Sequence, residues 1–252
     1  MERVQEKWPR WRTILLCTAA GFWALVPSLA QSGWDTPASA GKLDGLVILH
    51  AFYEGNSKDS YGAIIKTAIA TFGYPGVFAA APFDDGTQTT FALRDGSSVL
   101  MTNAELAKAK TEAKFLTDYP SADKRIADQA ETLYAVMVAR AVDLSPSNSS
   151  FKGISTWTQA ELLLSGAMGS KKNKRTVAAS DLAVLLGLKS VPLESREPAA
   201  YVHVSGAHAA FATGDVFDRQ GVGVPVWKSN LMHGSVLRPT TTWSKSDFAL
   251  SQ

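Results

Sequence analysis

The sequence is nearly free of cysteine, and this scarcity excludes a whole class of sites. Among its 252 residues the chain has one cysteine, Cys17, close to the N-terminus. A single cysteine forms neither an internal disulfide nor a zinc site made of cysteines, so a small disulfide-stapled scaffold is excluded. Hydrophobic residues make up 46% and charged residues 19% of the chain, a balance that supports a sizeable core and argues against disorder. The length predicts one large domain.

Long apolar runs are missing beyond the first 30 residues. Residues 1–12 carry four basic side chains, residues 13–29 are apolar and nearly uncharged, and Ser28-Leu29-Ala30 offers the small residues that a signal peptidase requires. We therefore expect residues 1–30 to be a signal peptide cleaved near Ala30, and residues 31–252 to be secreted or periplasmic. An uncleaved anchor is disfavoured because the apolar stretch is short and no stop-transfer segment follows it.

The chain also lacks an excess of one charge. Its formal net charge is +2, and removal of the signal peptide, with four basic and two acidic side chains, brings this value to zero. A neutral chain without a basic face predicts no nucleic-acid partner, and it gives no indication of peripheral membrane contact. The basic run 171–175 lies beside Gly169 and Ser170, so we expect a solvated loop there. Loss of Cys17 with the signal peptide leaves no thiol, and no cofactor or metal is predicted.

Hydrophobic periodicity divides the remaining chain into a helical front half, residues 31–195, and a β-rich back half, residues 196–252. In the front half the pattern predicts a strand at 43–52, a helix from Ser60 to the stop at 73–76, a hairpin of 87–93 with 98–101, and helices after Thr102 or Asn103, at 122–141, 158–166 and 180–186. In the back half it predicts strands at 201–205, 209–213 and 222–228, with a turn around Asp215 to Asp218. The predicted fold class is α+β.

One loop of this chain is placed where chemistry often occurs. Residues 54–61, Glu-Gly-Asn-Ser-Lys-Asp-Ser-Tyr, contain a glycine and bring Ser60 to the start of a predicted helix. Unpaired backbone N–H groups and the helix dipole stabilise an anion at such a position, and a nucleophile there reacts beside these donors. The simpler interpretation is that Ser60 or Asp59 only caps the helix, since both residue types are favoured caps.

The order of these motifs resembles that of the papain-like cysteine peptidases, the superfamily that includes the calpains. In that family a loop of the type Gln-Gly-x-Cys-x-x-Cys-Trp brings the second cysteine to the head of a long helix. Here Glu54 falls at the glutamine, Ser57 at the first cysteine, Ser60 at the nucleophile and Tyr61 at the aromatic residue. Both cysteines of the motif are therefore replaced by serine.

The back half continues the resemblance. Residues 206–214, Gly-Ala-His-Ala-Ala-Phe-Ala-Thr-Gly, look like the family's histidine segment and make His208 the counterpart of the catalytic base. Residues 227–230 followed by Gly234 are similar to the segment with the orienting asparagine, which makes Asn230 its counterpart. The resemblance implies a papain-like fold in which the helical half packs against the β-rich half, with a peptide- or protein-binding cleft between them.

The replaced residues imply that this site is catalytically silent. A thiol is readily held as thiolate beside an imidazole, whereas Ser60 would require His208 to act as a general base and Asn230 to orient it. The family's glutamine donates to the developing oxyanion, but a carboxylate of Glu54 about 4 Å away would repel it by roughly 4 kcal/mol at an effective dielectric near 20. That penalty corresponds to about a thousandfold in rate.

Three alternatives remain at the level of sequence. The first is an active peptidase or hydrolase, in which Ser60 is itself the nucleophile or Ser57 and Ser60 are engineered replacements for the cysteines of a cysteine peptidase. The run 45–50 resembles the first strand of an α/β-hydrolase, although no Gly-x-Ser-x-Gly elbow follows. A metal site is the third alternative, because the back quarter gathers five possible ligands, His203, His208, His233, Asp215 and Asp218.

Overall fold

A computed structural model describes residues 43–54, 60–118, 120–169, 175–193, 198–205, 208–225 and 234–240. The expected signal peptide, residues 1–30, lies outside these ranges. Residues 39–252 form one compact unit. Within the described ranges the chain mixes helices with antiparallel sheets, so the predicted α+β class is confirmed. None of the helices in these ranges is long and apolar enough to cross a membrane.

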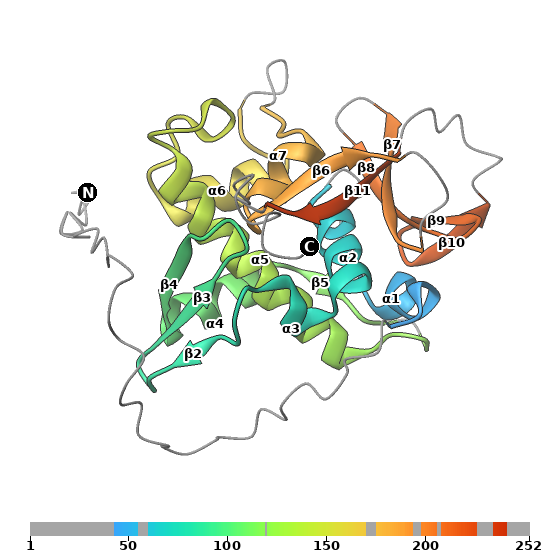
Figure 1. Cartoon of the computed structure of the whole chain (residues 1–252), viewed down its shortest axis with the longest axis horizontal. Helices are drawn as coiled ribbons and strands as arrows, with labels where there is room; N and C mark the ends of the chain where they lie inside the picture. The colour runs from blue at the N-terminus through green and yellow to red at the C-terminus, as the bar shows by residue number, and fades with distance from the viewer. Residues whose placement is uncertain are drawn as a thin grey trace, which may run out of the picture. The chain divides into compact units, whose positions relative to one another are not determined.

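A buried helix, α2 (Tyr61–Phe72), lies between the longest helix and the largest sheet (Figure 1). Every residue from Tyr61 to Ala70 is buried, so the helix contacts protein on all sides. It ends at Gly73, whose φ of 69° places it in the left-handed region and whose N–H donates to the carbonyl of Ile69. Both predicted boundaries of this helix are confirmed.

The helices predicted after Thr102 or Asn103, at 122–141, 158–166 and 180–186 are confirmed as α4, α5, α6 and α7, whereas α3 and the 3-10 turn η1 were not predicted. Thr102 and Glu105 form a capping box at the start of α4, and Asp123 caps α5. Every residue of α5 from Leu133 to Ala139 is buried, so this part of the helix contacts protein on all sides. These elements are α3 (Tyr74–Val77), α4 (Asn103–Glu112), α5 (Lys124–Leu144), the 3-10 turn η1 (Ser149–Phe151), α6 (Trp157–Leu164) and α7 (Ala179–Val184).

Two small sheets flank these helices. The predicted hairpin is confirmed as β3 (Gln88–Ala92) and β4 (Ser98–Thr102), and β2 (Phe83–Asp84) adds a third antiparallel strand. A short ribbon pairs β1 (Tyr53–Glu54) with β5 (Phe115–Leu116). This ribbon fixes the chain up to Glu54.

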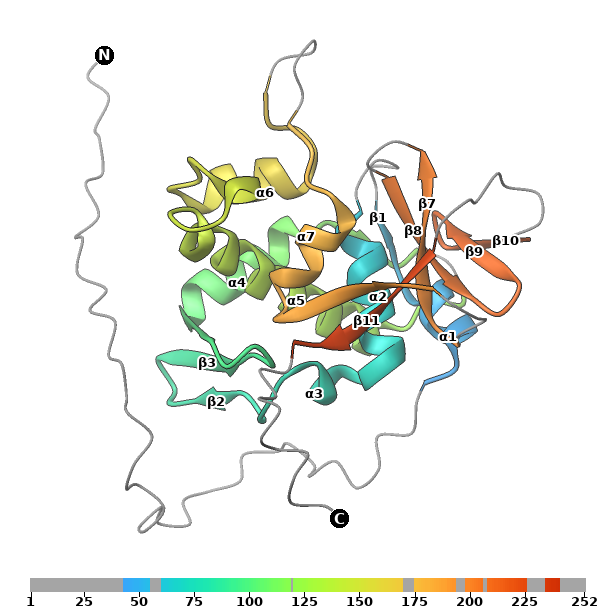
Figure 2. The same cartoon turned by 45° about the horizontal axis from the view of Figure 1, so that its top comes forward.

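The back half forms a six-stranded antiparallel sheet in the order β10-β9-β8-β7-β11-β6 (Figure 2). The predicted strands 201–205 and 209–213 are confirmed, and the described part of 222–228 is a strand to Pro225. The prediction missed three strands. One of them replaces the turn expected at 215–218, and another, β6, comes from the front half of the sequence. The strands are β6 (Leu188–Pro192), β7 (Ala200–Ser205), β8 (His208–Thr213), β9 (Val216–Arg219), β10 (Val222–Pro225) and β11 (Gly234–Pro239).

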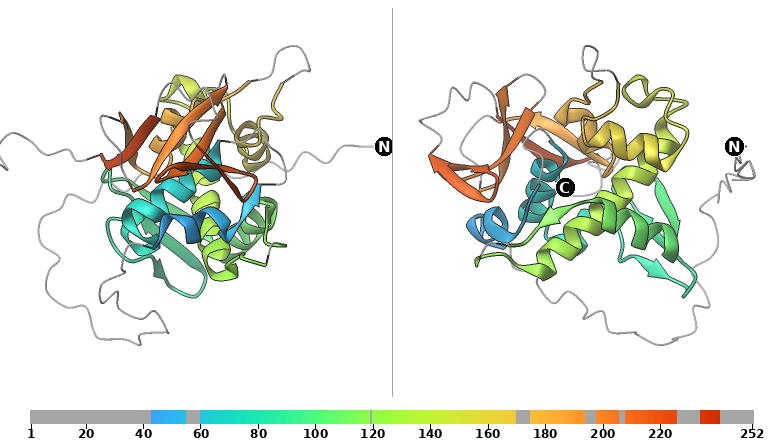
Figure 3. Two further views of the ribbon diagram at one scale, coloured as in Figure 1. Left: turned by 90° about the vertical axis from the view of Figure 1, so that its right-hand side faces the viewer. Right: turned by 180° about the vertical axis from the view of Figure 1, so that it is seen from behind.

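The strand predicted at 43–52 is wrong, because this segment is the helix α1 (Gly45–Ala51). Asp44 caps it by accepting from the N–H of Leu46, and the buried residues Ile48 and Leu49 fall on one face. A run of aliphatic residues this short does not distinguish strand from helix by period alone. The helix lies beside the β9–β10 hairpin (Figure 3). It also removes the first strand on which the α/β-hydrolase alternative depended.

Candidate functional site

Ser60 lies at the head of α2 and is 5% exposed. It occupies the N-cap position, but its side chain makes no capping bond to the helix. Its Oγ instead accepts a hydrogen bond of 2.9 Å from the backbone N–H of Ala209 in β8. Ser60 is therefore the N-cap residue by position, but its hydroxyl joins the helix to the sheet; Asp59, the other candidate cap, lies outside the described residues.

The partner of Ser60 lies at an irregular end of its strand. Ala209 is opposite His203 and His208 is opposite Ser205, so β7 contains one extra residue, Val204, in a bulge. Side chains alternate along β8, and Ala209 belongs to the core cluster that contains the buried face of α2. The half-buried His208 precedes it at the first position of the strand. The backbone of Ala209 thus makes the bond to Ser60.

Tyr61 holds the N-terminal end of α2 against α5 and β5. Its side chain is buried, and its hydroxyl donates to the carbonyl of Ala113 at 3.2 Å. Its ring lies 5.0 Å from that of Tyr134 on α5 and 5.8 Å from that of Phe115 on β5. Aromatic pairs at such separations add to the stabilisation from burial. Ser60 is therefore fixed from both sides, by β8 and by this aromatic cluster.

Glu54 is directed at the first turn of α2. A Cβ atom added to Gly62 would lie 1.9 Å from Glu54 Oε1, so the carboxylate fills the space that a side chain at position 62 would need. Glu54 itself is held in β1 by its pairing with Phe115. The carboxylate of Glu54 therefore packs over Gly62 in the first turn of α2.

The structure does not test the other predicted positions to the same extent. Ser57 and Asn230 lie outside the described residues, as does His233. Among the residues that the structure does describe, no three histidine, cysteine, aspartate or glutamate side chains form a group that could hold a metal ion. His203 packs its ring edge-on against Tyr201 at 5.7 Å, which is a structural contact.

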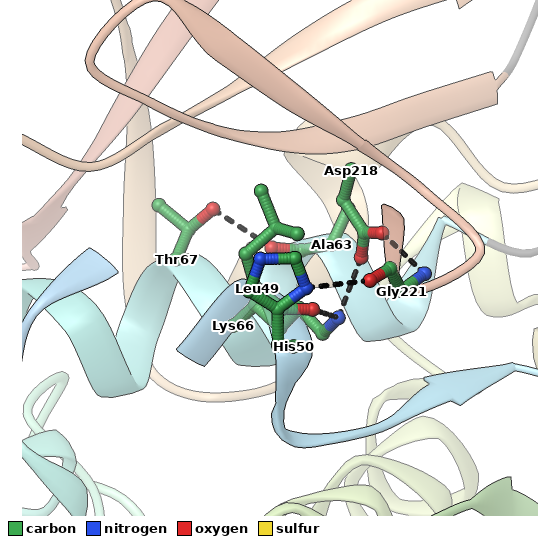
Figure 4. A network of polar contacts seen from close by, with 7 residues as sticks. All are labelled: Leu49, His50, Ala63, Lys66, Thr67, Asp218 and Gly221. Atoms are coloured by element: carbon green, nitrogen blue, oxygen red, sulfur yellow. Dashed lines mark hydrogen bonds and ion pairs between the residues drawn. The ribbon is translucent and has the colours of Figure 1, made fainter. Parts of the chain in front are cut away.

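A buried charged network lies farther along α2 (Figure 4). Lys66 is 2% exposed, and its Nζ donates to the carbonyl of Leu49 at 2.7 Å and to Asp218 Oδ2 at 2.5 Å. The other carboxylate oxygen of Asp218 accepts from the N–H of Gly221 at 2.7 Å. His50 Nδ1 lies 2.7 Å from the carbonyl of Gly221. The network joins α1, α2 and the β9–β10 hairpin.

The environment of Lys66 contains opposing electrostatic effects. Burial lowers the pKa of Lys66 below its usual value, because desolvation disfavours the ammonium, while the charges of Asp218 and Glu54 oppose this shift. The ammonium also lies 4.7 Å from the centroid of the Phe52 ring, a favourable cation–π distance. The influence of Glu54 on Lys66 connects this network to the head of the helix.

Sequence reasoning missed Lys66, and it named Asp218 only as a turn residue and a possible metal ligand. Asp218 was expected in a turn, and a lysine in a helix is normally solvated. A signal was present, since Lys66 lies within an otherwise uncharged run from Tyr61 to Phe72 and a helix without a polar face is buried all round. A lysine inside such a helix requires an internal partner.

Comparison of the chain with protein-family models, with curated proteins and with solved structures gave no match.

Proposed function

We propose that the chain is an exported homologue of the papain-like peptidases that has lost catalysis and binds an extended peptide or protein segment. The site would be the region where the head of α2 meets the start of β8. Ser60 would occupy the nucleophile position, His208 the position of the base and Asn230 that of the orienting residue. This proposal adds the family and the function to the α+β class described above.

The hydrogen bond between Ser60 Oγ and the N–H of Ala209 is the observation that carries the proposal. The resemblance pairs the helix head with the histidine segment, although 149 residues separate the two bonded groups in sequence. Contact between these two segments is what a papain-like arrangement requires. In the chain the buried helix α2 comes first and most of the antiparallel sheet follows. This sequence of elements is compatible with a papain-like arrangement.

The surroundings of Ser60 favour a silent site over an active one. Ser60 is 5% exposed, and its hydroxyl accepts a hydrogen bond from a backbone N–H, which withdraws electron density from the oxygen. A serine nucleophile needs a base within hydrogen-bond reach and an accessible Oγ. The carboxylate of Glu54 at the helix head would further oppose a developing oxyanion. Binding of a segment requires none of these groups to react.

Hydrolysis and binding measurements on the same protein preparations test this proposal. We expect the wild type and Ser60→Ala to show the same background rate on fluorescein-labelled casein. The labelled casein should nevertheless bind, as measured by fluorescence anisotropy, and His208→Ala should weaken that binding at least fivefold. Arg175→Ala is the matched control on a remote loop, where Arg175 donates to the carbonyls of Ser150 and Lys152.

Two outcomes would overturn the proposal in different ways. Hydrolysis by the wild type that Ser60→Ala abolishes would make the protein an active serine hydrolase. Absence of binding to casein would remove the binding role. Recovery of peptidase activity in Ser60→Cys would identify the arrangement as papain-like and the serine as the cause of silence.

The exported state is tested separately from the site. Expression of the full chain in a bacterial host should give a mature protein that begins at Gln31. Intact-mass measurement and N-terminal sequencing would establish the first residue. Retention of residues 1–30 on the mature protein would contradict a cleaved signal.

A further inference from the structure

Lys66 carries a buried positive charge that the proposed binding role does not use. It lies one helical turn after Gly62, on the same face of α2, since residues four apart are neighbours on a helix. Helical side chains lean toward the N-terminus, so the ammonium of Lys66 is directed back toward the turn that contains Gly62. The carboxylate of Glu54 fills the space beside that glycine.

The position of this ammonium is fixed by groups from two other elements. The carbonyl of Leu49 on α1 and the carboxylate of Asp218 on β9 both accept hydrogen bonds from Nζ, at 2.7 and 2.5 Å. Figure 4 shows both bonds converging on Nζ. Asp218 is held in turn by the N–H of Gly221. An ammonium fixed in this way cannot move aside when the charge near it changes.

We propose that Lys66 is the positioning residue of the first turn of α2: its ammonium compensates the charge of Glu54, whose carboxylate packs over Gly62 two residues after Ser60, and Asp218 holds the ammonium in place. The inference rests on the proposed function in taking Ser60 as the centre of the site. Glu54, Lys66 and Asp218 then act as one charge cluster that sets the electrostatic potential at position 60.

The elements packed against the first turns of α2 bring further titratable groups to this region. Besides Lys66, four ionisable side chains stand on elements around this helix and its network, namely His50 on α1, Glu54 on β1, His208 on β8 and Asp218 on β9. Two unit charges about 8–10 Å apart at an effective dielectric near 20 shift each other's pKa by about one unit. A titratable reporter at position 60 would therefore register the loss of each of these charges that lies within that range.

A cysteine at position 60 supplies this reporter. In the full chain with Cys17→Ser, the thiolate of Ser60→Cys absorbs near 240 nm, and subtraction of the Ser60 parent removes the tyrosine signal. Glu54→Gln in this background should lower the thiol pKa by about one unit, and Lys66→Met should raise it by about one unit. Lys66→Arg keeps the charge and should leave the pKa unchanged.

Two further variants complete the experiment. Arg140→Met removes the cation of the Arg140–Asp95 pair, which is 3.0 Å long and joins α5 to the β3–β4 turn, so it should not move the thiol pKa. The double variant Glu54→Gln/Lys66→Met removes opposite charges and should return the pKa to the parent value. If Lys66→Met fails to fold, Lys66→Gln makes the same change in charge and can still donate to the carbonyl of Leu49.

The results separate this inference from the proposed function. An unchanged thiol pKa in both Lys66→Met and Lys66→Gln, with a shift in Glu54→Gln, would overturn the role of Lys66 and leave the binding proposal intact. A shift in the Lys66 variants without any response to His208→Ala would support the role of Lys66 and count against the papain-like pairing of Ser60 with His208.

Discussion

The two sides of α2 are built from different chemistry. Toward the sheet, Ser60, Lys66 and Thr67 are all buried, and each bonds to a different strand: Ser60 to Ala209 of β8, Lys66 to Asp218 of β9, and Thr67 to the carbonyl of Ala200 in β7. Toward α5, buried aliphatic and aromatic side chains provide most of the contact.

This difference suggests that the two sides of α2 have different roles: one stabilises the fold, and the other sets the alignment of the helix with the strands. Apolar packing stabilises an interface in proportion to the area buried, but it tolerates changes of shape at nearly constant volume. A buried polar group is costly unless its partner lies in the correct place, so it favours one alignment over all others. We infer that α5 supplies much of the stability of this fold, whereas the polar side of α2 determines which strand lies over which turn.

The largest expected effect comes from breaking the ion pair on the polar side. Asp218→Ala would leave the buried ammonium of Lys66 without its charged partner, at a cost of about 3–5 kcal/mol in the free energy of unfolding. The double variant Lys66→Met/Asp218→Leu removes both charges and should recover more than half of that loss. Urea unfolding followed by circular dichroism measures both; a double variant as unstable as the sum of the single changes would contradict the account.

On the apolar side, toward α5, the loss in the free energy of unfolding should depend only on the side-chain volume that a substitution removes. Leu133 on α5 is fully buried, and Leu133→Ala should destabilise the protein by about 2–5 kcal/mol through the cavity it leaves. Leu133→Met keeps the volume and should cost less than about 1.5 kcal/mol. Similar large losses for both variants in urea unfolding would show that α5 also depends on exact shape.

A smaller effect on stability is expected at Thr67, and it distinguishes a hydrogen bond between α2 and the sheet from one within a single helix. The hydroxyl of Thr67 donates to Ala63 in its own helix at 2.7 Å and to Ala200 at 3.2 Å. Thr67→Val should cost about 1 kcal/mol and increase amide exchange in β7. Thr111→Val is the control, because that hydroxyl donates to the carbonyl of Ala107 within its own helix, α4. Equal effects of the two variants on β7 would contradict a role in register.

The smallest expected effect on stability comes from Tyr74 and is limited to alkaline pH. Burial raises the pKa of Tyr74 to about 12, with the Thr132 hydroxyl opposing the shift. In the unfolded chain this phenol loses its proton near its usual value of 10.0, so its contribution to stability is complete below that pH and is lost as pH rises through about 12. Tyr74→Phe should remove this part of the alkaline destabilisation and change little at pH 7; an unchanged profile would contradict it.

The sequence predicted the elements that local patterns determine. The helix after Ser60 has Gly73 as its stop, and the capping box of Thr102 and Glu105 lies within four residues, so both could be recognised without knowledge of the fold. α1 could not, because its short aliphatic run fits two periods. The strands β6 and β11 pair with each other across about 45 residues of chain, and neither has a strong alternation of its own.

In the candidate site, too, local motifs could be recognised from the sequence and long-range contacts could not. A resemblance in motif order directed attention to Ser60 and Glu54: Ser60 is the N-cap of α2, and the carboxylate of Glu54, from β1, packs over Gly62 in its first turn. Neither the Ser60–Ala209 bond nor the Lys66–Asp218 pair follows from local sequence, because each joins groups about 150 residues apart. What decides these contacts is the way the sheet packs on α2, and only the folded chain contains that information.

Amide hydrogen exchange at Ala209 tests most directly whether Ser60 is a structural link between α2 and β8. We predict that this N–H is protected in the wild type, and that Ser60→Ala makes its exchange at least tenfold faster while amides in α5 keep their rates. Equal protection of Ala209 in the two proteins would contradict the account, because the hydroxyl of Ser60 would then not be the group that accepts this bond.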